Sequence, residues 1–491
     1  MRARLFARQS IEALAARSDV DAALPRTLGW FSLTCFGVGS TIGAGIFVLT
    51  GVVAADHAGP AVVISFLLAG VACALAGLCY AEFASMTPVA GSAYTYAYAT
   101  LGEVVAWFIG WCLVLEYMFA AALVAIGWAG YAVSMAADFG LTLPASLTQA
   151  PLDVGPHGLG ATGGLFNAPA AAVVILCVAL LLAGMRVAAR VNDLIVVAKV
   201  AAILVVGVAG LMFAHGEHWS PFVPPNSGSF GEFGVSGVVA GAAIVFYAYV
   251  GFDAVSAMSQ ETRDAQRVVP WALIASLAIC TLLYVLIALM VTGLADYREL
   301  GVPDPVYVAL ARAGSSLAWA KPMIGAVVVI GLISALLVTL LGQVRIFYAM
   351  ARDGLLPPMF AAVDRRARTP IAGTLVTGVV AALVAGAFPL RLLGELISIG
   401  TLLAFAIVCV GVIVLRRRRP DLERPFKAPG YPWTPLGGIA VCVVLMASLP
   451  TDTWLRLAVW LAIGAALYAG YGLRRSALLR QGAAPREPPQ T

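Results

Sequence analysis

Long apolar runs are the feature of this 491-residue chain that most restricts its fold. About twelve of them approach the roughly 20 residues that an α-helix needs to cross a bilayer. Charged residues are only 11% of the chain, against about a quarter in soluble domains, which excludes a soluble enzyme, a nucleic-acid-binding module and a disordered chain. The sequence therefore predicts an all-α polytopic membrane protein with spans near 28–53, 61–85, 104–136, 167–185, 191–214, 235–258, 270–293, 321–350, 370–388, 392–415, 432–449 and 453–473.

Basic side chains fall almost entirely on one side of the predicted membrane. Twelve spans place both termini on the same side, and 24 of the 30 Lys and Arg residues lie on that side, against five on the other. Loops with an excess of Lys and Arg stay in the cytoplasm, so we expect cytoplasmic termini and a place in the cell inner (plasma) membrane. The net charge of +5 therefore reflects topology and does not indicate a nucleic-acid partner.

Glycines interrupt the middle of the first and sixth spans. Residues 40–47 read STIGAGIF, with Gly43 and Gly45, and residues 246–253 read FYAYVGFD, with Gly251. Glycine in a helix interior costs up to about 1 kcal/mol. Unwound backbone survives in a bilayer only where it lines a cavity or is buried in protein. Taken alone, Gly43 and Gly45 fit close helix packing equally well.

The two interruptions occupy equivalent places if spans 1–5 and spans 6–10 are equivalent units. Because each unit has five helices, the second would be inverted, as in secondary transporters whose substrate lies between two broken helices. A half-helix N-terminus offers free N–H groups to a carboxylate, and a half-helix C-terminus offers free C=O groups to an ammonium. The pattern predicts a five-plus-five inverted-repeat fold with broken helices 1 and 6, which binds an α-amino acid between them.

This fold divides the chain into five parts. They are a cytoplasmic N-terminal segment at 1–27, a first repeat at 28–214, a second repeat at 233–415, two further spans at 430–473 and a cytoplasmic tail at 474–491.

Four stretches of the sequence resemble a known family of transporters. They are residues 37–51 (GVGSTIGAGIFVLTG), 78–96 (LCYAEFASMTPVAGSAYTY), 246–253 and 345–357 (RIFYAMARDGLLP). In them the chain resembles the amino acid–polyamine–organocation (APC) superfamily, specifically its bacterial cationic amino acid transporter branch, and the resemblance covers residues 10–475. It implies the five-plus-five inverted-repeat fold, known as LeuT-like, and amino acid transport.

The resemblance implies roles for the backbone at the two interruptions. First-span positions would hold the substrate carboxylate and help to hold its amino group: Thr41, Ile42, Gly43, Ala44 and Gly45. Sixth-span positions would complete the ammonium site: Phe246, Ala248, Tyr249 and Gly251. Phe252 would form an aromatic lid on the outer side. The chain departs from the usual pattern at Tyr247, where a usual Phe is replaced and a hydroxyl is added, and at Asp264-Ala265, which replaces a usual Asn-Pro in a loop.

Two charged side chains lie inside predicted spans. Lys199, in the fifth span, costs at least about 2.5–3.5 kcal/mol in a bilayer and so needs a partner. Burial favours its neutral form, so we expect Lys199 to carry a coupling proton and, when protonated, to bind carbonyls of spans 1 and 8 in the outward-open state. The resemblance implies the same role, and snorkelling to the cytoplasmic end is the alternative. Glu116, in the third span, would favour a cationic substrate side chain, relay protons or, as a protonated carboxyl, cap unwound backbone.

The favoured function is proton-coupled symport of an L-amino acid, neutral or cationic, by alternating access. An exchanger of amino acids or polyamines with the same fold is the alternative. A membrane-embedded enzyme is remote, since the sequence contains neither His-Glu-x-x-His nor Gly-x-Ser-x-Gly. The eight Cys lie in apolar runs without a Cys-x-x-Cys pair, so we expect no metal site, and no cofactor is indicated. The expected partners are the amino acid, the proton and the lipid bilayer, with a small accessory membrane subunit left open.

Overall fold

The computed structural model describes residues 29–86, 92–155, 158–182, 189–257, 262–364 and 370–476. The predicted segment 1–27 and most of the predicted tail 474–491 lie outside these residues. The described chain is helical, as predicted, except for the strands β1 (Leu152–Gly155) and β2 (Gly158–Ala161). These two strands pair antiparallel in the predicted loop between spans 3 and 4, so the described part of the chain is all-α apart from this strand pair.

Helical structure is present at every predicted span. Ten spans each consist mainly of one helix: α5 (Val62–Met86), α7 (Glu103–Asp138), α9 (Ala168–Leu182), α10 (Ala189–Leu211), α13 (Ala265–Leu294), α15 (Ala320–Arg352), α16 (Ile371–Ala387), α17 (Leu390–Arg418), α18 (Trp433–Ala447) and α19 (Thr451–Leu467). Among the described residues, six helical segments are long and apolar enough to cross a membrane, and five shorter apolar helices accompany them.

The first and sixth spans are each built from separate pieces. α3 (Trp30–Thr41) ends before Ile42 and Gly43, and helical structure then continues through η1 (Gly45–Leu49), α4 (Thr50–Val53) and η2 (Ala54–Ala58). α11 (Gly234–Val245) continues into one 3-10 turn, η5 (Phe246–Tyr249), stops at Val250 and Gly251, and is followed by α12 (Ala254–Ala257). Each predicted interruption thus coincides with an end of regular helix, where backbone N–H and C=O groups lose their partners.

Short elements and prolines set the ends of the long helices. Pro370, Pro389 and Pro450 stand immediately before α16, α17 and α19, where no helical N–H is required of them. The connecting elements are η3 (Gly59–Ala61), α6 (Ser92–Thr100), α8 (Ala145–Thr148), η4 (Gly216–Trp219), η7 (Tyr297–Glu299), α14 (Pro305–Arg312), η8 (Gly314–Leu317), η9 (Pro358–Phe360), η10 (Tyr468–Gly472) and α20 (Leu473–Arg475).

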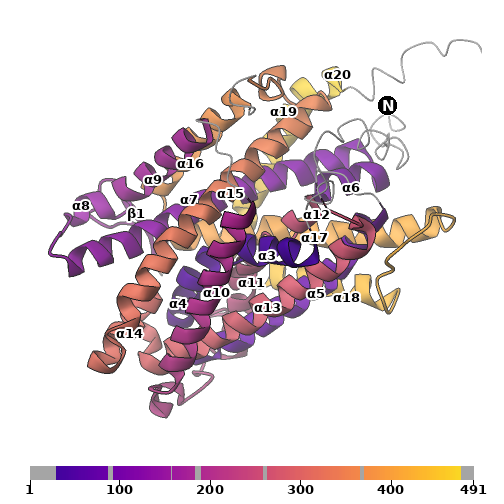
Figure 1. The fold of residues 1–491 in the computed structure, drawn as a ribbon. Helices are drawn as coiled ribbons and strands as arrows, with labels where there is room; N and C mark the ends of the chain where they lie inside the picture. Colours follow the sequence, from indigo (N-terminus) through magenta and orange to yellow (C-terminus); the bar gives the residue numbers. More distant parts are fainter. Residues whose placement is uncertain are drawn as a thin grey trace, which may run out of the picture.

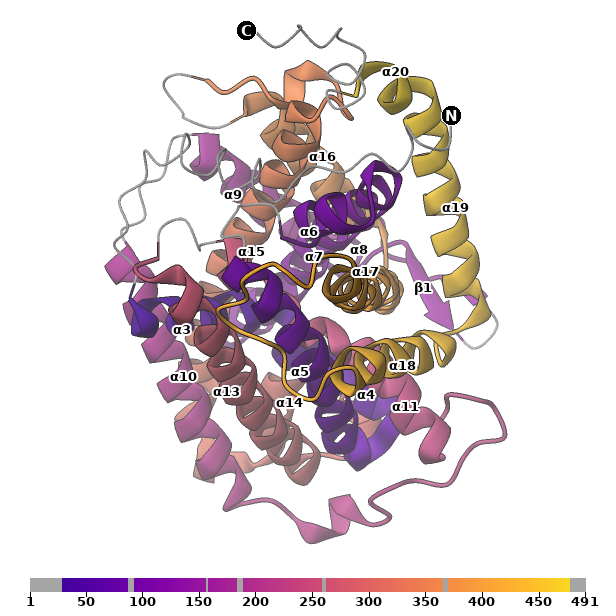
Figure 2. The same cartoon turned by 90° about the vertical axis from the view of Figure 1, so that its right-hand side faces the viewer.

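The long helices run side by side along one axis of the molecule (Figure 1). α8, β1 and α14 lie towards one end of this axis, and α6, α20 and the segment after α17 lie towards the other. α7 is the most enclosed of the six long apolar segments, because 89% of its most apolar 18-residue stretch is buried. The corresponding share for Thr451–Arg475, which contains α19, is 22%, and α19 lies at the rim of the bundle (Figure 2). We call the second end the arginine-bearing end, because α15, α17 and α20 end there in Arg352, Arg416–Arg418 and Arg474–Arg475.

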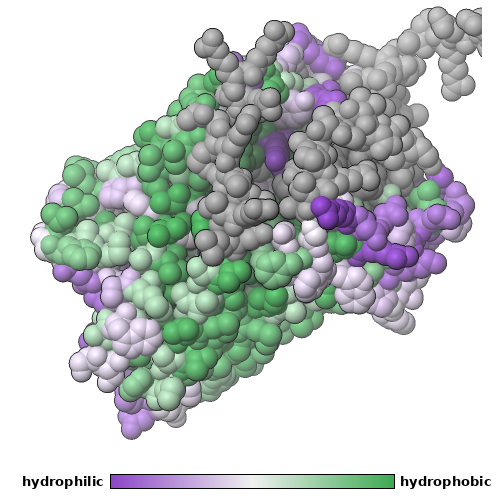
Figure 3. All heavy atoms as spheres, viewed as in Figure 1, coloured by the Kyte–Doolittle hydropathy of each residue, from purple (hydrophilic) through white to green (hydrophobic). Residues whose placement is uncertain are grey.

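The lateral surface of the bundle is apolar. Apolar side chains cover the middle of the visible face, and hydrophilic ones gather towards its ends (Figure 3). Leu67 and Val71 on α5, Leu204 and Val208 on α10, and Leu282 on α13 are all exposed. Soluble monomers rarely expose contiguous apolar patches of such extent, so this surface is suited to contact with lipid.

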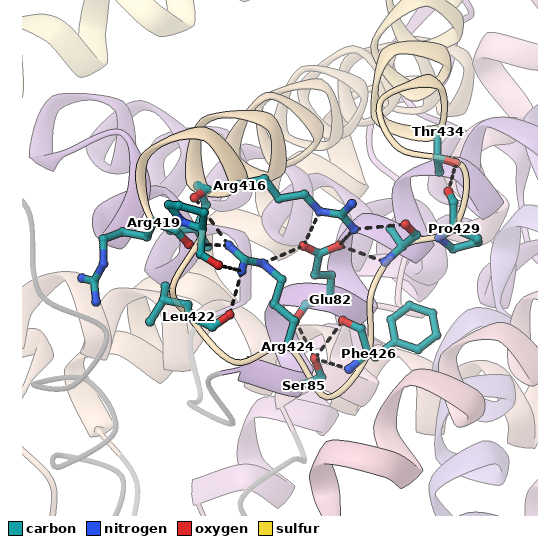
Figure 4. Close-up of polar contacts among 12 residues, drawn as sticks. Glu82, Ser85, Arg416, Arg419, Leu422, Arg424, Phe426, Pro429 and Thr434 are labelled. Carbon is teal, nitrogen blue, oxygen red and sulfur yellow. Dashed lines mark hydrogen bonds and ion pairs between the residues drawn. The ribbon is translucent and has the colours of Figure 1, made fainter.

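A buried polar cluster ties two spans together at the arginine-bearing end (Figure 4). The Glu82 carboxylate on α5 accepts hydrogen bonds from Arg416 Nε at 2.9 Å, from Arg416 Nη2 at 2.5 Å and from the Ala428 N–H at 2.9 Å. Arg424 Nε lies 3.4 Å from Glu82 Oε1, and an Nη of Arg424 donates to the Arg419 carbonyl at 2.7 Å. We call Glu82, Arg416, Arg424 and Ala428 the Glu82 cluster; its bonds offset the desolvation of a carboxylate that is 1% exposed.

Candidate functional site

The interruptions of the first and sixth spans lie directly against each other. The Ser40 hydroxyl at the end of α3 donates to the Gly251 carbonyl at 3.0 Å. Gly251 has φ +112°, and a Cβ there would lie 2.7 Å from the Ser40 carbonyl oxygen. A Cβ on Gly45 would lie 2.3 Å from the Ala248 Cα. Glycine is therefore required at both positions for the two backbones to approach this closely.

A cavity opens beside these interruptions. The space between its atoms, counted together with its open mouth, is about 510 Å³. α3, η1, α7, η5 and α15 and the residues that link them provide its walls. The lining residues are Ser40, Thr41, Gly43, Ala44, Gly45, Glu116, Tyr117, Ala120, Val124, Tyr247, Val250, Gly251, Ala335, Val338 and Thr339.

The structure brings part of the predicted substrate site to this cavity. Five predicted positions line it: Thr41, Gly43, Ala44, Gly45 and Gly251. The four others, Ile42, Phe246, Ala248 and Tyr249, are buried behind the wall. The Tyr249 hydroxyl donates to the Phe66 carbonyl at 2.9 Å, and the Phe246 ring packs on Phe405 with ring centroids 5.4 Å apart.

Lys199 contacts the first-span interruption. Its Nζ on α10 donates to the Ile42 carbonyl at 2.8 Å, and the side chain is 1% exposed. A Cβ on Gly331 of α15 would lie 2.9 Å from Lys199 Cε, so the absence of a side chain there makes room for the lysine. The amine therefore lies inside the protein, bonded to span 1 and beside Gly331 of span 8, and does not snorkel to the end of its helix. The predicted bonds to carbonyls of both spans in an outward-open state, and the role in proton coupling, stay predictions.

Tyr284 on α13 was not predicted and joins both interruptions. Its buried hydroxyl lies 3.0 Å from the Thr41 carbonyl oxygen and 2.5 Å from the Ala248 carbonyl oxygen. A tyrosine inside an apolar run indicates a buried hydroxyl that needs a partner, and this was the available signal in the sequence. The signal does not reveal which carbonyls, far away in the chain, receive the hydroxyl.

Glu116 on α7 lines the cavity, a position that its predicted contact with a cationic substrate side chain would require. The side chain is 2% exposed, the Thr401 hydroxyl lies beside it, and its Oε2 has no hydrogen-bond partner among the described residues. Tyr247, the position where a hydroxyl was expected near the site, also lines the cavity.

Phe252 is placed away from the cavity. Its ring is fully buried and packs edge-on against Tyr80 at 5.8 Å and Phe405 at 5.2 Å between ring centroids. It does not line the cavity in this conformation.

Comparison with known proteins identifies the family. Residues 28–467 match the family model described as amino acid permease. The chain belongs to the amino acid permease family. Its membership of the APC superfamily is therefore confirmed, a LeuT-like fold follows for it, and it is a multi-pass membrane transporter rather than an enzyme.

Two relatives of this permease are similar to it over nearly their whole length, and a third over about two thirds of its length. The methylthioribose transporter of Bacillus subtilis (strain 168) is 44% identical over 474 residues, which cover 96% of the permease and 99% of the relative. The branched-chain amino acid permease BcaP of the same bacterium is 41% identical, covering 97% and 100%. The vacuolar cationic amino acid transporter 4 of Arabidopsis thaliana is 38% identical over 82% of the permease and 66% of its own length.

The cavity of the permease is more open towards the arginine-bearing end. Ser40 on α3, Tyr117 on α7 and Thr339 on α15 lie on that side of the lining and are partly exposed. Val124 and Ala335, further from that end on α7 and α15, are buried. From Tyr117 to Val124 on α7, and from Thr339 to Ala335 on α15, the lining therefore changes from partly exposed to buried with distance from the arginine-bearing end.

Contacts close the permease at the opposite end. Asp56 in η2 forms an ion pair with Arg391 at the start of α17. The Tyr131 hydroxyl on α7 donates to the Phe47 carbonyl in η1 at 2.7 Å. The half of the first span that follows the interruption is thus tied to α7 and α17 in this conformation.

Proposed function

We propose that this permease is a proton-coupled symporter of L-amino acids that works by alternating access. The observation that carries the proposal is the 2.8 Å bond from Lys199 Nζ to the Ile42 carbonyl at the first-span interruption. A protonated amine donates a stronger, charge-assisted hydrogen bond than a neutral one. Gain or loss of one proton on Lys199 therefore changes how firmly α10 holds the interrupted backbone beside the substrate cavity.

The proposed substrate site uses both kinds of helix end. Backbone N–H groups from Gly43 to Gly45 begin the second half of the first span and would hold a carboxylate. Carbonyls that end α3 and η5, with Gly251 beside them, would hold the amino group. The predicted set, from Thr41 to Gly45 with Phe246, Ala248, Tyr249 and Gly251, remains our assignment. In it, the Phe246 side chain packs on Phe405, and the Tyr249 hydroxyl bonds the Phe66 carbonyl.

The proposed architecture is the predicted one of twelve spans. Residues 28–214 and 233–415 form two inverted repeats, residues 430–473 add two spans, and the termini are cytoplasmic in the plasma membrane. The arginine-bearing end then faces the cytoplasm, so the conformation described above is inward-facing. Phe252 would act as an aromatic lid only after the sixth span has moved.

A thio-sugar is the second candidate substrate. It is favoured by the 44% identity to a methylthioribose transporter over 96% of the chain. A free α-amino acid is supported instead by the carboxylate and ammonium partners at the interruptions and by the 41% identity to BcaP.

Uptake into proteoliposomes tests the proposed function. We expect radiolabelled uptake of at least one of the twenty amino acids to rise with an inward proton gradient and to need no sodium. Lys199→Ala should abolish the response to the gradient, whereas Lys321→Ala, whose amine bonds Asp138 at 2.8 Å far from the cavity, should keep it.

Three results would contradict this proposal in different ways. Gradient-driven uptake that persists in Lys199→Ala would remove the coupling role of Lys199. Uptake only into vesicles preloaded with substrate would show an exchanger. Uptake of methylthioribose without that of any amino acid would establish the second candidate.

A further inference from the structure

One wall of the cavity is polar and lacks basic side chains. Glu116 and Tyr117 of α7, Tyr247 of η5 and Thr339 of α15 all line it. The described residues of the lining include no Lys, Arg or His, and Lys199 lies behind the first span rather than in the wall. Each of these four side chains can accept a hydrogen bond, and the three hydroxyls can also donate one.

Glu116 leaves one of these acceptors unused. Its Oε2 is buried and has no hydrogen-bond partner among the described residues. A buried carboxyl oxygen without a partner is costly, and a ligand that donates a hydrogen bond would remove that cost. The oxygen accepts a hydrogen bond whether or not the carboxyl carries a proton on its other oxygen.

Tyr247 adds a hydroxyl to the same wall. Its phenol is close enough to Glu116 for the two groups to interact electrostatically. The Thr339 hydroxyl donates to the Ala335 carbonyl at 2.8 Å, which leaves its lone pairs towards the cavity free to accept. The ring of Tyr247 would pack equally well as phenylalanine, so the hydroxyl is the separable part of this side chain.

We infer that Glu116 and Tyr247 form a subsite that selects substrates whose far end carries a hydrogen-bond donor, either an ammonium or a hydroxyl. The inference rests on the proposed function and names the class of substrate within it. A site built to hydrogen-bond a substrate strongly disfavours analogues that lack the bonding group, because its own polar atoms are then left unpaired. A plain aliphatic side chain would leave Glu116 Oε2 in this state and would form no hydrogen bond with the Tyr247 hydroxyl.

Three amino acids of matched length separate the possibilities. L-Norleucine, L-lysine and 6-hydroxy-L-norleucine share one carbon chain and end in a methyl, an ammonium and a hydroxyl. We expect competition assays in proteoliposomes to give an apparent affinity for lysine or 6-hydroxynorleucine at least tenfold above that for norleucine. Preference for lysine alone would identify an ammonium subsite, and equal preference for both would identify a general donor subsite; either supports the inference.

Two conservative variants assign the selectivity to residues. Tyr247→Phe should reduce the preference for 6-hydroxynorleucine by two- to tenfold, the effect of about one hydrogen bond. Glu116→Gln should reduce the preference for lysine by more than that, because bonds to charged groups are stronger. Tyr471→Phe, in η10 and outside the cavity lining, is the matched control and should change neither ratio.

The result that overturns the inference is distinct from failure of the proposed function. If norleucine competes as well as the other two, or if the ratios are unchanged in both variants while transport persists, the subsite is wrong and the transporter assignment stands. If no amino acid is bound or transported, the proposed function itself fails, and the subsite fails with it.

Discussion

At the residue scale, Lys199 and Tyr284 occupy the carbonyls that the two interruptions release. Lys199 binds Ile42, and the Tyr284 hydroxyl lies within 3.0 Å of both Thr41 and Ala248. A phenol has one hydrogen, so Tyr284 donates to one of its two carbonyls at a time. The other carbonyl is left with an acceptor for a further donor, which the amino group of a bound amino acid would supply.

Tyr284→Phe tests this sharing. We expect a KM for the transported amino acid that rises by two- to tenfold with the proton response retained, because one shared donor is lost while Lys199 is untouched. Concentration-dependent uptake in proteoliposomes measures both quantities. Tyr471→Phe serves as the control with an unchanged KM, and an unchanged KM in Tyr284→Phe as well would show that the hydroxyl does not order the carbonyls.

At the element scale, the closest approach between the two broken spans depends on a missing side chain. Gly45→Ala would place a Cβ 2.3 Å from the Ala248 Cα, and backbone at this position cannot rotate away. We expect transport to be lost and thermal stability to fall, with a cost of about 1–3 kcal/mol for overpacking. Gly470→Ala, where a Cβ would meet nothing within 4 Å, is the matched control. Normal transport by Gly45→Ala, measured beside this control, would show that the contact is dispensable.

The Glu82 cluster joins α5 to the end of α17 through a buried charge. Glu82→Gln should destabilise the permease by about 3–5 kcal/mol, because it leaves the buried Arg424 and the half-buried Arg416 without their carboxylate. Thermal unfolding in detergent measures the change. Asp421→Asn breaks an exposed ion pair with Arg419 in the same segment and should leave the midpoint temperature of unfolding unchanged. Equal midpoints for Glu82→Gln and the unmodified protein would indicate that water replaces these bonds.

At the scale of the whole molecule, the sequence was sufficient for the spans and the interruptions but not for the pairing between spans. The lengths of the apolar runs and the positions of the glycines are local properties of the sequence. They predicted where helices span the membrane and where two of these helices are interrupted. Tyr284 contacts Thr41, 243 residues away along the chain, and Ala248, 36 residues away, while Glu82 contacts Arg416, 334 residues away. Spans that are apolar on all sides carry little pattern that specifies which face meets which neighbour, so these contacts required the structure.

The direction in which the cavity opens is a property of the whole bundle and can be tested with one cysteine. Val338 lines the cavity and is partly exposed, while all eight native cysteines are buried, so background labelling should be low. We expect Val338→Cys to react with a charged, membrane-impermeant thiol reagent applied to inside-out vesicles but not to right-side-out ones, and substrate to slow the reaction.

Val124→Cys, at the buried side of the same cavity, should react far more slowly from the cytoplasmic face. Val124 and Val338 line the same cavity, so a difference in their labelling rates reports on which side of the cavity is open. Labelling of Val338→Cys from the outer face alone would place the arginine-bearing end outside the cell and reverse the topology. Labelling of both cysteines from both faces at equal rates would indicate a continuous pore, which is incompatible with alternating access.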